Sequence, residues 1–149
     1  MIKKITNYLT SLLNIAPERD KPDHNAAIAS LLCSVSYADH KIAKVEHIAI
    51  KKSLTLQLGI KKTEVDELIE LAKQNMLKST SIFDFTSLLT DLSHEARIGV
   101  IEMMWSVAYA DGHLGEIEEA IIRRVAGLLY VPHSEFIRTK LKVTGELVS

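Results

Sequence analysis

Two acidic turns carry the side chains with the clearest chemical potential in this sequence. In the first turn Asp39 is followed seven positions later by Glu46, and in the second Asp111 is followed at the same spacing by Glu118. Carboxylate oxygens are the ligands that hard divalent cations prefer, and several of them must surround one ion. If the two turns lie against each other, these four acids form a metal site, for which calcium, magnesium, manganese and zinc are the cations to test.

The same acids also have a purely structural interpretation. A glutamate in the first turn of a helix can accept a hydrogen bond from the N-cap amide, and its charge is favoured at that end of the helix dipole. An aspartate in a turn can accept from nearby backbone amides. The spacing is not that of an EF-hand, because His113, Gly115 and Ile122 stand at the third, fifth and twelfth positions after Asp111 is counted as the first. Both interpretations therefore stay open.

The acids belong to a longer internal repeat. Residues 34–39 and 106–111 share serine, valine, tyrosine, alanine and aspartate at matching positions, 72 residues apart. A single long repeat of this kind indicates a duplicated helical unit inside one domain. The second copy is the more acidic, with Glu116 and Glu119 where the first has Lys44 and His47. A cation site in the second half alone is thus a further alternative.

The hydrophobic pattern predicts the elements that must position these turns. Apolar residues recur at helical spacing along the chain, and no run alternates in the manner of a half-buried strand. The fold expected is all-α, a compact bundle of seven to eight helices built from two pseudo-repeated helical halves. Thr63 and Ser93 are the predicted N-caps of two of them. The helices are predicted at residues 1–15, 26–38, 44–58, 63–77, 82–92, 97–110, 116–129 and 134–141.

We expect a single domain over residues 1–149. Residues 1–25 supply an N-terminal helix and a proline-containing linker, residues 26–78 the first half, and residues 79–149 the second half. A chain of this length can bury roughly 68–70% of its unfolded surface, which is enough for one core.

Composition narrows the classes of function. The chain has 18 basic and 19 acidic residues and a formal net charge of -1, so no overall field attracts nucleic acid, and none is expected as a partner. No segment reaches the ~18 consecutive apolar residues of a membrane span, so no direct membrane insertion is expected. The single cysteine, Cys33, suits a reducing compartment, and the predicted location is the cytoplasm. Phosphate-binding glycine loops and nucleophile elbows are lacking in the sequence, so no enzyme is predicted.

The segment Val107–Glu119, with its shorter copy around Asp39, resembles the hallmark of the tellurite-resistance TerB family. The resemblance covers about residues 26–141. It implies a compact, all-helical cytoplasmic protein linked to tellurite and other stress responses, which acts with membrane-associated and metal-binding partners. By position, the metal ligands that the resemblance implies are Asp39, Glu46, Asp111 and Glu118.

Three functions are weighed on these grounds. The first is a non-enzymatic stress-response adaptor that binds protein partners and takes a divalent cation at the repeated turns. The alternative is a purely structural module for protein–protein interaction or self-association into a homo-oligomer, without metal. A metal-dependent hydrolase is the least favoured, because it would need a cation with an open coordination position beside a cleft.

Overall fold

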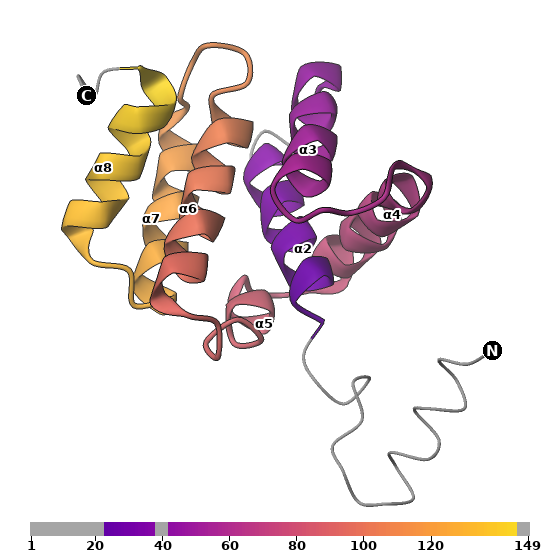
Figure 1. Cartoon of the computed structure of the whole chain (residues 1–149), viewed down its shortest axis with the longest axis horizontal. Coiled ribbons are helices and arrows are strands. Elements are labelled where there is room, and N and C mark those ends of the chain that lie inside the picture. Colours follow the sequence, from indigo (N-terminus) through magenta and orange to yellow (C-terminus); the bar gives the residue numbers. More distant parts are fainter. Residues whose placement is uncertain (1–22, 38–41, 146–149) are drawn as a thin grey trace, which may run out of the picture.

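The computed structural model describes residues 23–37 and 42–145, and within those ranges the chain forms helices and no strand (Figure 1). The all-α prediction is confirmed. The helix predicted at residues 1–15 lies outside the described residues. The helices are α2 (His24–Ser36), α3 (Lys44–Leu56), α4 (Lys62–Lys78), α5 (Phe83–Thr86), α6 (His94–Ala108), α7 (Glu116–Leu128) and α8 (His133–Thr144).

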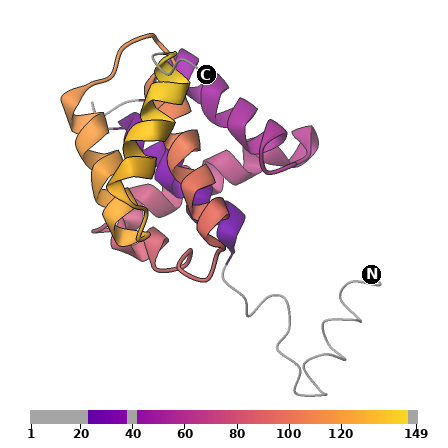
Figure 2. The same cartoon turned by 60° about the vertical axis from the view of Figure 1, so that its left-hand side comes forward.

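The helices α2 and α6 lie at the centre of the bundle. In Figures 1 and 2, α3 and α4 lie on one side of this pair, and α7 and α8 lie on the other. From Ala26 to Cys33 every residue of α2 is buried, and α6 is buried over most of its length from Val100 onward. A helix that is apolar nearly all round is stable only when neighbours cover every face. The absence of charge in this part of α2 therefore fixes its central place.

The described ends of the two repeated turns have closely similar backbones. The C-cap residue of α2 is Tyr37 (φ −86°, ψ 10°), and that of α6 is Tyr109 (φ −93°, ψ 9°). The following helices begin after Ala43 (φ −69°, ψ 157°) and Gly115 (φ −78°, ψ 151°). The bounds of α3, shifted by the 72 positions of the sequence repeat, coincide with those of α7. The helix order thus follows the repeat in the sequence.

The predicted cap at Thr63 is wrong. Helix α4 begins one residue earlier, at Lys62, and its N-cap is Lys61, whose side chain makes no capping hydrogen bond. The Lys61 carbonyl accepts from the amides of Glu64 and Val65, both at 2.9 Å. With the first turn already closed on Lys61, Thr63 lies inside the helix and cannot cap it.

The helix predicted over residues 82–92 is also too long. Helix α5 ends at Thr86, and the chain continues as turns to residue 92. These turns are closed by hydrogen bonds between residues three positions apart, such as that from the Leu89 amide to the Thr86 carbonyl at 2.9 Å. The hydroxyls of Ser87 and Thr90 also approach nearby carbonyls, which gives the backbone an alternative to a regular helix.

Ser93, the other predicted cap, is confirmed. Its hydroxyl accepts a hydrogen bond from the Ala96 amide at 3.1 Å at the start of α6. Ser93→Ala should therefore lower the free energy of unfolding by about 1 kcal/mol, measured by urea denaturation. Ser87→Ala is the matched control, because the Ser87 hydroxyl lies 3.5 Å from its carbonyl partner and should contribute no more than about 0.5 kcal/mol. Equal losses in the two variants would contradict a capping role.

Candidate functional site

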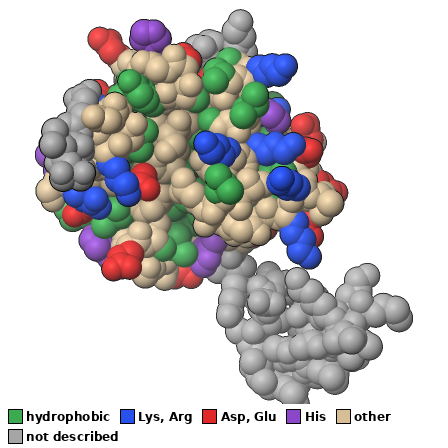
Figure 3. Space-filling view, turned by 45° about the horizontal axis from the view of Figure 1, so that its top comes forward, with side chains coloured by type: hydrophobic (Ala, Val, Ile, Leu, Met, Phe, Trp, Pro, Cys, Tyr) green, Lys and Arg blue, Asp and Glu red, His purple; other side chains and the backbone are tan. Residues whose placement is uncertain are grey.

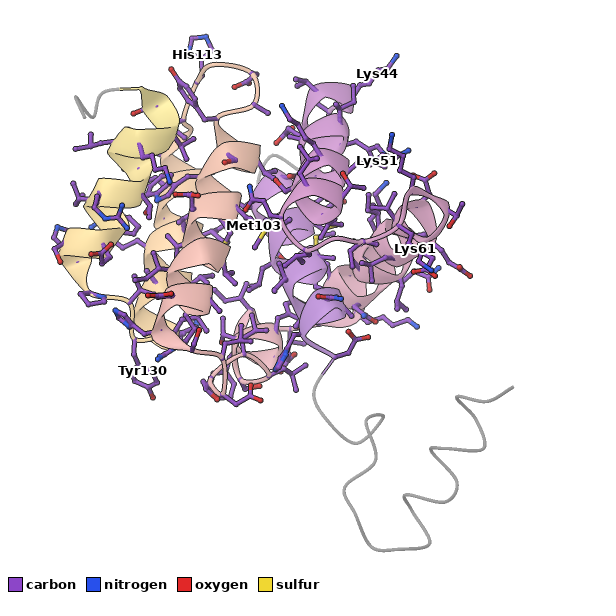
Figure 4. The ribbon with its side chains drawn as sticks, in the orientation of Figure 1. Lys44, Lys51, Lys61, Met103, His113 and Tyr130 are labelled. Carbon is purple, nitrogen blue, oxygen red and sulfur yellow. The ribbon has the colours of Figure 1, made fainter. Side chains whose placement is uncertain are left out.

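A hollow of about 350 Å³ lies between the start of α3 and the turn that joins α6 to α7. Three of the four predicted acids, Glu46, Asp111 and Glu118, line it together. The fourth, Asp39, falls outside the described residues. Figure 4 labels His113 on the second turn and Lys44 at the start of α3, which mark the two sides of this end of the bundle. The complete lining consists of Ser36, Glu46, Asp111, Gly115, Glu116, Ile117 and Glu118.

The two glutamates hold equivalent positions in their helices. Glu46 accepts from the Ala43 amide at 3.2 Å, and Glu118 accepts from the Gly115 amide at 3.1 Å. Each bond is the glutamate half of a capping box. Alanine and glycine have no side-chain oxygen with which to return the bond, so the side-chain part of each box is the glutamate bond to the N-cap amide. The capping predicted for these two residues is confirmed.

Asp111 organises the turn between α6 and α7. Its Oδ1 accepts from the His113 amide at 2.9 Å, which is the local turn bond predicted for an aspartate here. Gly112, the residue between them, has φ +85°, a conformation that glycine adopts without steric strain. Asp111 therefore has a local role in the turn and also lines the hollow.

Capping and turn carboxylates are also of the ligand type that hard divalent cations prefer. The start of α7 adds further negative charge, since Glu116, Glu118 and Glu119 all lie in its first turn. Glu119 points elsewhere and pairs with Lys140 at 2.6 Å. A cation in the hollow would offset the mutual repulsion of the carboxylates around it.

Among the residues that the structure describes, no group of three or more histidine, cysteine, aspartate or glutamate side chains is arranged to hold a metal ion. Glu46, Asp111 and Glu118 share a hollow but do not form a finished ligand set there. The predicted metal site, which includes Asp39, stays a prediction.

Sequence reasoning missed part of the lining. Ser36 is buried at the end of α2, where its hydroxyl donates to the Leu32 carbonyl at 3.0 Å. Ile117 is 63% exposed and forms an apolar edge beside the acids. Ile117 lies between Glu116 and Glu118 in the first turn of α7, whereas the buried residues of α7 lie on its other side. An apolar residue in this position is the sequence signal that marks Ile117 as exposed beside the acids.

The fold and its acidic turns define an all-helical domain in which two helix–turn–helix units each carry a capping glutamate. A family model described as tellurite resistance protein TerB matches residues 25–141. The chain belongs to this family, as the resemblance of residues 107–119 implied. No curated protein and no solved structure was found to match the chain. Within the described ranges, no helix has the length and apolar character needed to cross a membrane.

Proposed function

We propose that this tellurite-resistance-type domain is a non-enzymatic cytoplasmic adaptor in a stress response, and that a divalent cation binds in its acidic hollow. The observation that supports the proposal is the shared lining. Glu46 comes from the first half, and Asp111 and Glu118 come from the second, yet all three border the same space. Such an adaptor would bind protein partners, including membrane-associated ones.

The position of the hollow suggests what a cation would do. It would interact with carboxylates from α3 and from the α6–α7 turn, and so tie the two halves together at one end of the bundle. Cation binding that depends on both halves would stabilise their relative position, because a ligand that binds only the folded state raises its stability. A partner that recognises this end would then respond to the cation.

A calorimetric titration with calcium, magnesium, manganese or zinc tests this proposal. Wild-type protein should bind at least one of them, and Asp111→Asn combined with Glu118→Gln should abolish binding. Both replacements keep a carbonyl oxygen for the His113 and Gly115 amides, so the turn and the helix start are retained while the charge is removed.

Glu119→Gln is the matched control, because Glu119 has the same charge in the same helical turn but pairs with Lys140. It should leave cation binding unchanged. Wild-type protein that binds none of the four cations removes the cation from the proposal. Full binding by the double variant, checked for folding by its melting curve, would place the site elsewhere.

A structural interaction module without metal is the second candidate. Met103, Met104 and Trp105 are not its contact residues, because the structure buries all three, as expected. The observation in its favour is on α3, where Val45, Ile48 and Leu56 are exposed. The hydrolase remains the least favoured of the three functions.

A further inference from the structure

A hollow of about 460 Å³ lies between α3 and the C-terminal part of α6. Small residues from both sides line it, and they leave the space between the helices unfilled. The hydroxyl of one of them, Ser106, is already satisfied, because it donates to the Glu102 carbonyl at 3.1 Å. The described lining consists of Val45, Ile48, Ala49, Lys52, Ser53, Leu56, Gln57, Ser106 and Ala110.

Three large apolar side chains of α3 are exposed beside this hollow. Val45, Ile48 and Leu56 are 41%, 55% and 72% exposed, and all three belong to the lining. Along the helix they cover about 16 Å, or roughly three turns. Figure 3 shows hydrophobic side chains among basic ones on the side of the molecule that carries α3 and α4. An exposed apolar strip of this kind marks a contact site.

The internal repeat shows that the fold does not need the largest of these side chains. Ile48 of α3 corresponds to Ala120 of α7, 72 positions later, and both positions are exposed. The two helices have matching bounds, so a helix of the same length forms with alanine at this position. The apolar surface that Ile48 adds is therefore available for a contact with another molecule.

The charge at the hollow is positive. Lys52 is the one charged residue among the described lining residues. Lys51 beside it pairs with Asp66 at 3.1 Å, whereas Lys52 makes no ion pair within residues 23–37 and 42–145. Lys44 is exposed at the start of α3, next to Val45. An occupant with carboxylates at its edge complements this surface, and such complementarity speeds encounter and selects the partner.

We propose that this hollow docks an acidic amphipathic helix of a partner protein, with its apolar side chains between α3 and α6 and a carboxylate against Lys52. Helices that bind in grooves present apolar residues at every third or fourth position, and three turns of such a helix match the exposed strip. The docking rests on the adaptor role proposed above, to which it gives a kind of partner, and it requires no cation.

Two other occupants fit the surface less well. A lipid surface would contact the exposed strip without entering the hollow between the helices. Two copies of this chain that face each other through the hollow would bring their Lys52 side chains together, and like charges repel. The partner helix fills the hollow and pairs with the lysine.

Binding of synthetic peptides to the full-length chain tests the docking. One peptide is a helix of about four turns, with leucine at every third or fourth position and glutamate beside the leucines. The second has lysine in place of each glutamate. Fluorescence anisotropy measures affinity, and amide chemical shifts locate the peptide. The glutamate peptide should bind at least about tenfold more tightly than the lysine peptide and shift the amides of Val45, Ile48 and Ser106.

Two variants separate the apolar part of the contact from the charged part. Ile48→Ala should weaken binding of the glutamate peptide about tenfold, because it removes apolar surface from the contact. Lys52→Glu should weaken the glutamate peptide about tenfold and tighten the lysine peptide, because the charge at the hollow is reversed. Arg124→Glu is the matched control, since Arg124 holds the repeat position of Lys52 on α7 and does not line the hollow. It should leave both affinities unchanged.

Equal affinities for the two peptides, or full binding of the glutamate peptide by Lys52→Glu, would overturn the proposal. So would shifts at Leu71 and Leu88, which would place the peptide in the hollow lined by α2, α4 and α5. Sedimentation of the protein with phosphatidylglycerol vesicles that is lost in Lys52→Glu would make a lipid surface the occupant. A wild-type dimer in ultracentrifugation that Ile48→Ala dissociates would make a second copy the occupant.

Docking and cation binding are measured separately. The peptide titrations contain no divalent cation, and Asp111→Asn combined with Glu118→Gln should bind the glutamate peptide as the wild type does. Failed docking is thus seen with the Lys52 and Ile48 variants. Failed cation binding is seen in the metal titrations of the Asp111 and Glu118 variants.

Discussion

Trp105→Ala should lower the free energy of unfolding by about 3–5 kcal/mol. Trp105 is fully buried in α6, and its ring centroid lies 5.0 Å from that of Phe136 on α8. Its removal leaves a cavity between two helices that pack closely, and the neighbouring side chains can fill that space only in part. Urea denaturation monitored by circular dichroism measures the loss.

Trp105→Phe separates packing from hydrogen bonding. Within the described part of the chain, the indole nitrogen is buried and has no hydrogen-bond partner, so phenylalanine removes no such bond. It should therefore lose less than Trp105→Ala, because it removes only part of the ring system and leaves a smaller cavity. Leu77→Ala, at an exposed position of α4, should change stability by no more than about 0.5 kcal/mol. A Trp105→Ala loss as small as that of Leu77→Ala would show that α6 and α8 are not held together by this contact.

The central helices could be predicted from composition, because a helix that is buried on all sides contains few charged residues. Residues 26–38 contain no charge, and α6 contains one charged residue, Glu102, after Arg97. Glu102 lies at the edge of the core, where Lys142 of α8 pairs with it at 3.0 Å. A charge can stand on a central helix only at such an edge, because an isolated buried charge is costly. Composition alone therefore identified the two helices that every other element packs around.

Two helix boundaries were predicted wrongly, and in both cases local hydrogen bonding outweighed the sequence pattern. Residues 82–92 have leucines and phenylalanines at helical spacing, but Ser87 and Thr90 offer hydroxyl contacts to nearby carbonyls and the turns tighten. At Thr63, the general preference for threonine at N-caps was outweighed by the backbone geometry at Lys61. Periodicity reports which face is buried, and it says little about where a helix ends.

The candidate site could be predicted only in part, because hydrophobic periodicity does not show which helices pack against each other. The repeat placed Glu46 and Glu118 in equivalent positions, and their capping bonds follow from local rules. That Glu46 shares a hollow with Asp111 depends on how α3 packs against α6, which are far apart in the sequence. The hollow between those helices, lined by Val45, Ile48 and Ser106 among others, is likewise visible only once that packing is known.

Raising the pH from 9 to 12 should remove about 3 kcal/mol of stability through Cys33 alone. Burial raises the pKa of its thiol from 9.0 to about 12, while nearby Lys73 lowers it and Glu70 raises it to smaller extents. Between these values the unfolded chain releases the thiol proton and the folded chain keeps it. The unfolded state then binds fewer protons, so stability is fully present below pH 9 and falls by about 1.36 kcal/mol per pH unit above it.

The comparison with Cys33→Ala isolates this contribution, because lysines and tyrosines titrate over the same range in both proteins. Free energies of unfolding from urea denaturation should fall more steeply with pH in the wild type, by about 1 kcal/mol per unit between pH 9 and 10.5. The alanine variant is less stable at pH 7, where the smaller side chain leaves a void beside α4, yet its curve should approach that of the wild type at high pH. Parallel curves would mean that Cys33 ionises as readily in the folded chain as in the unfolded one, and that the centre of α2 is open to water.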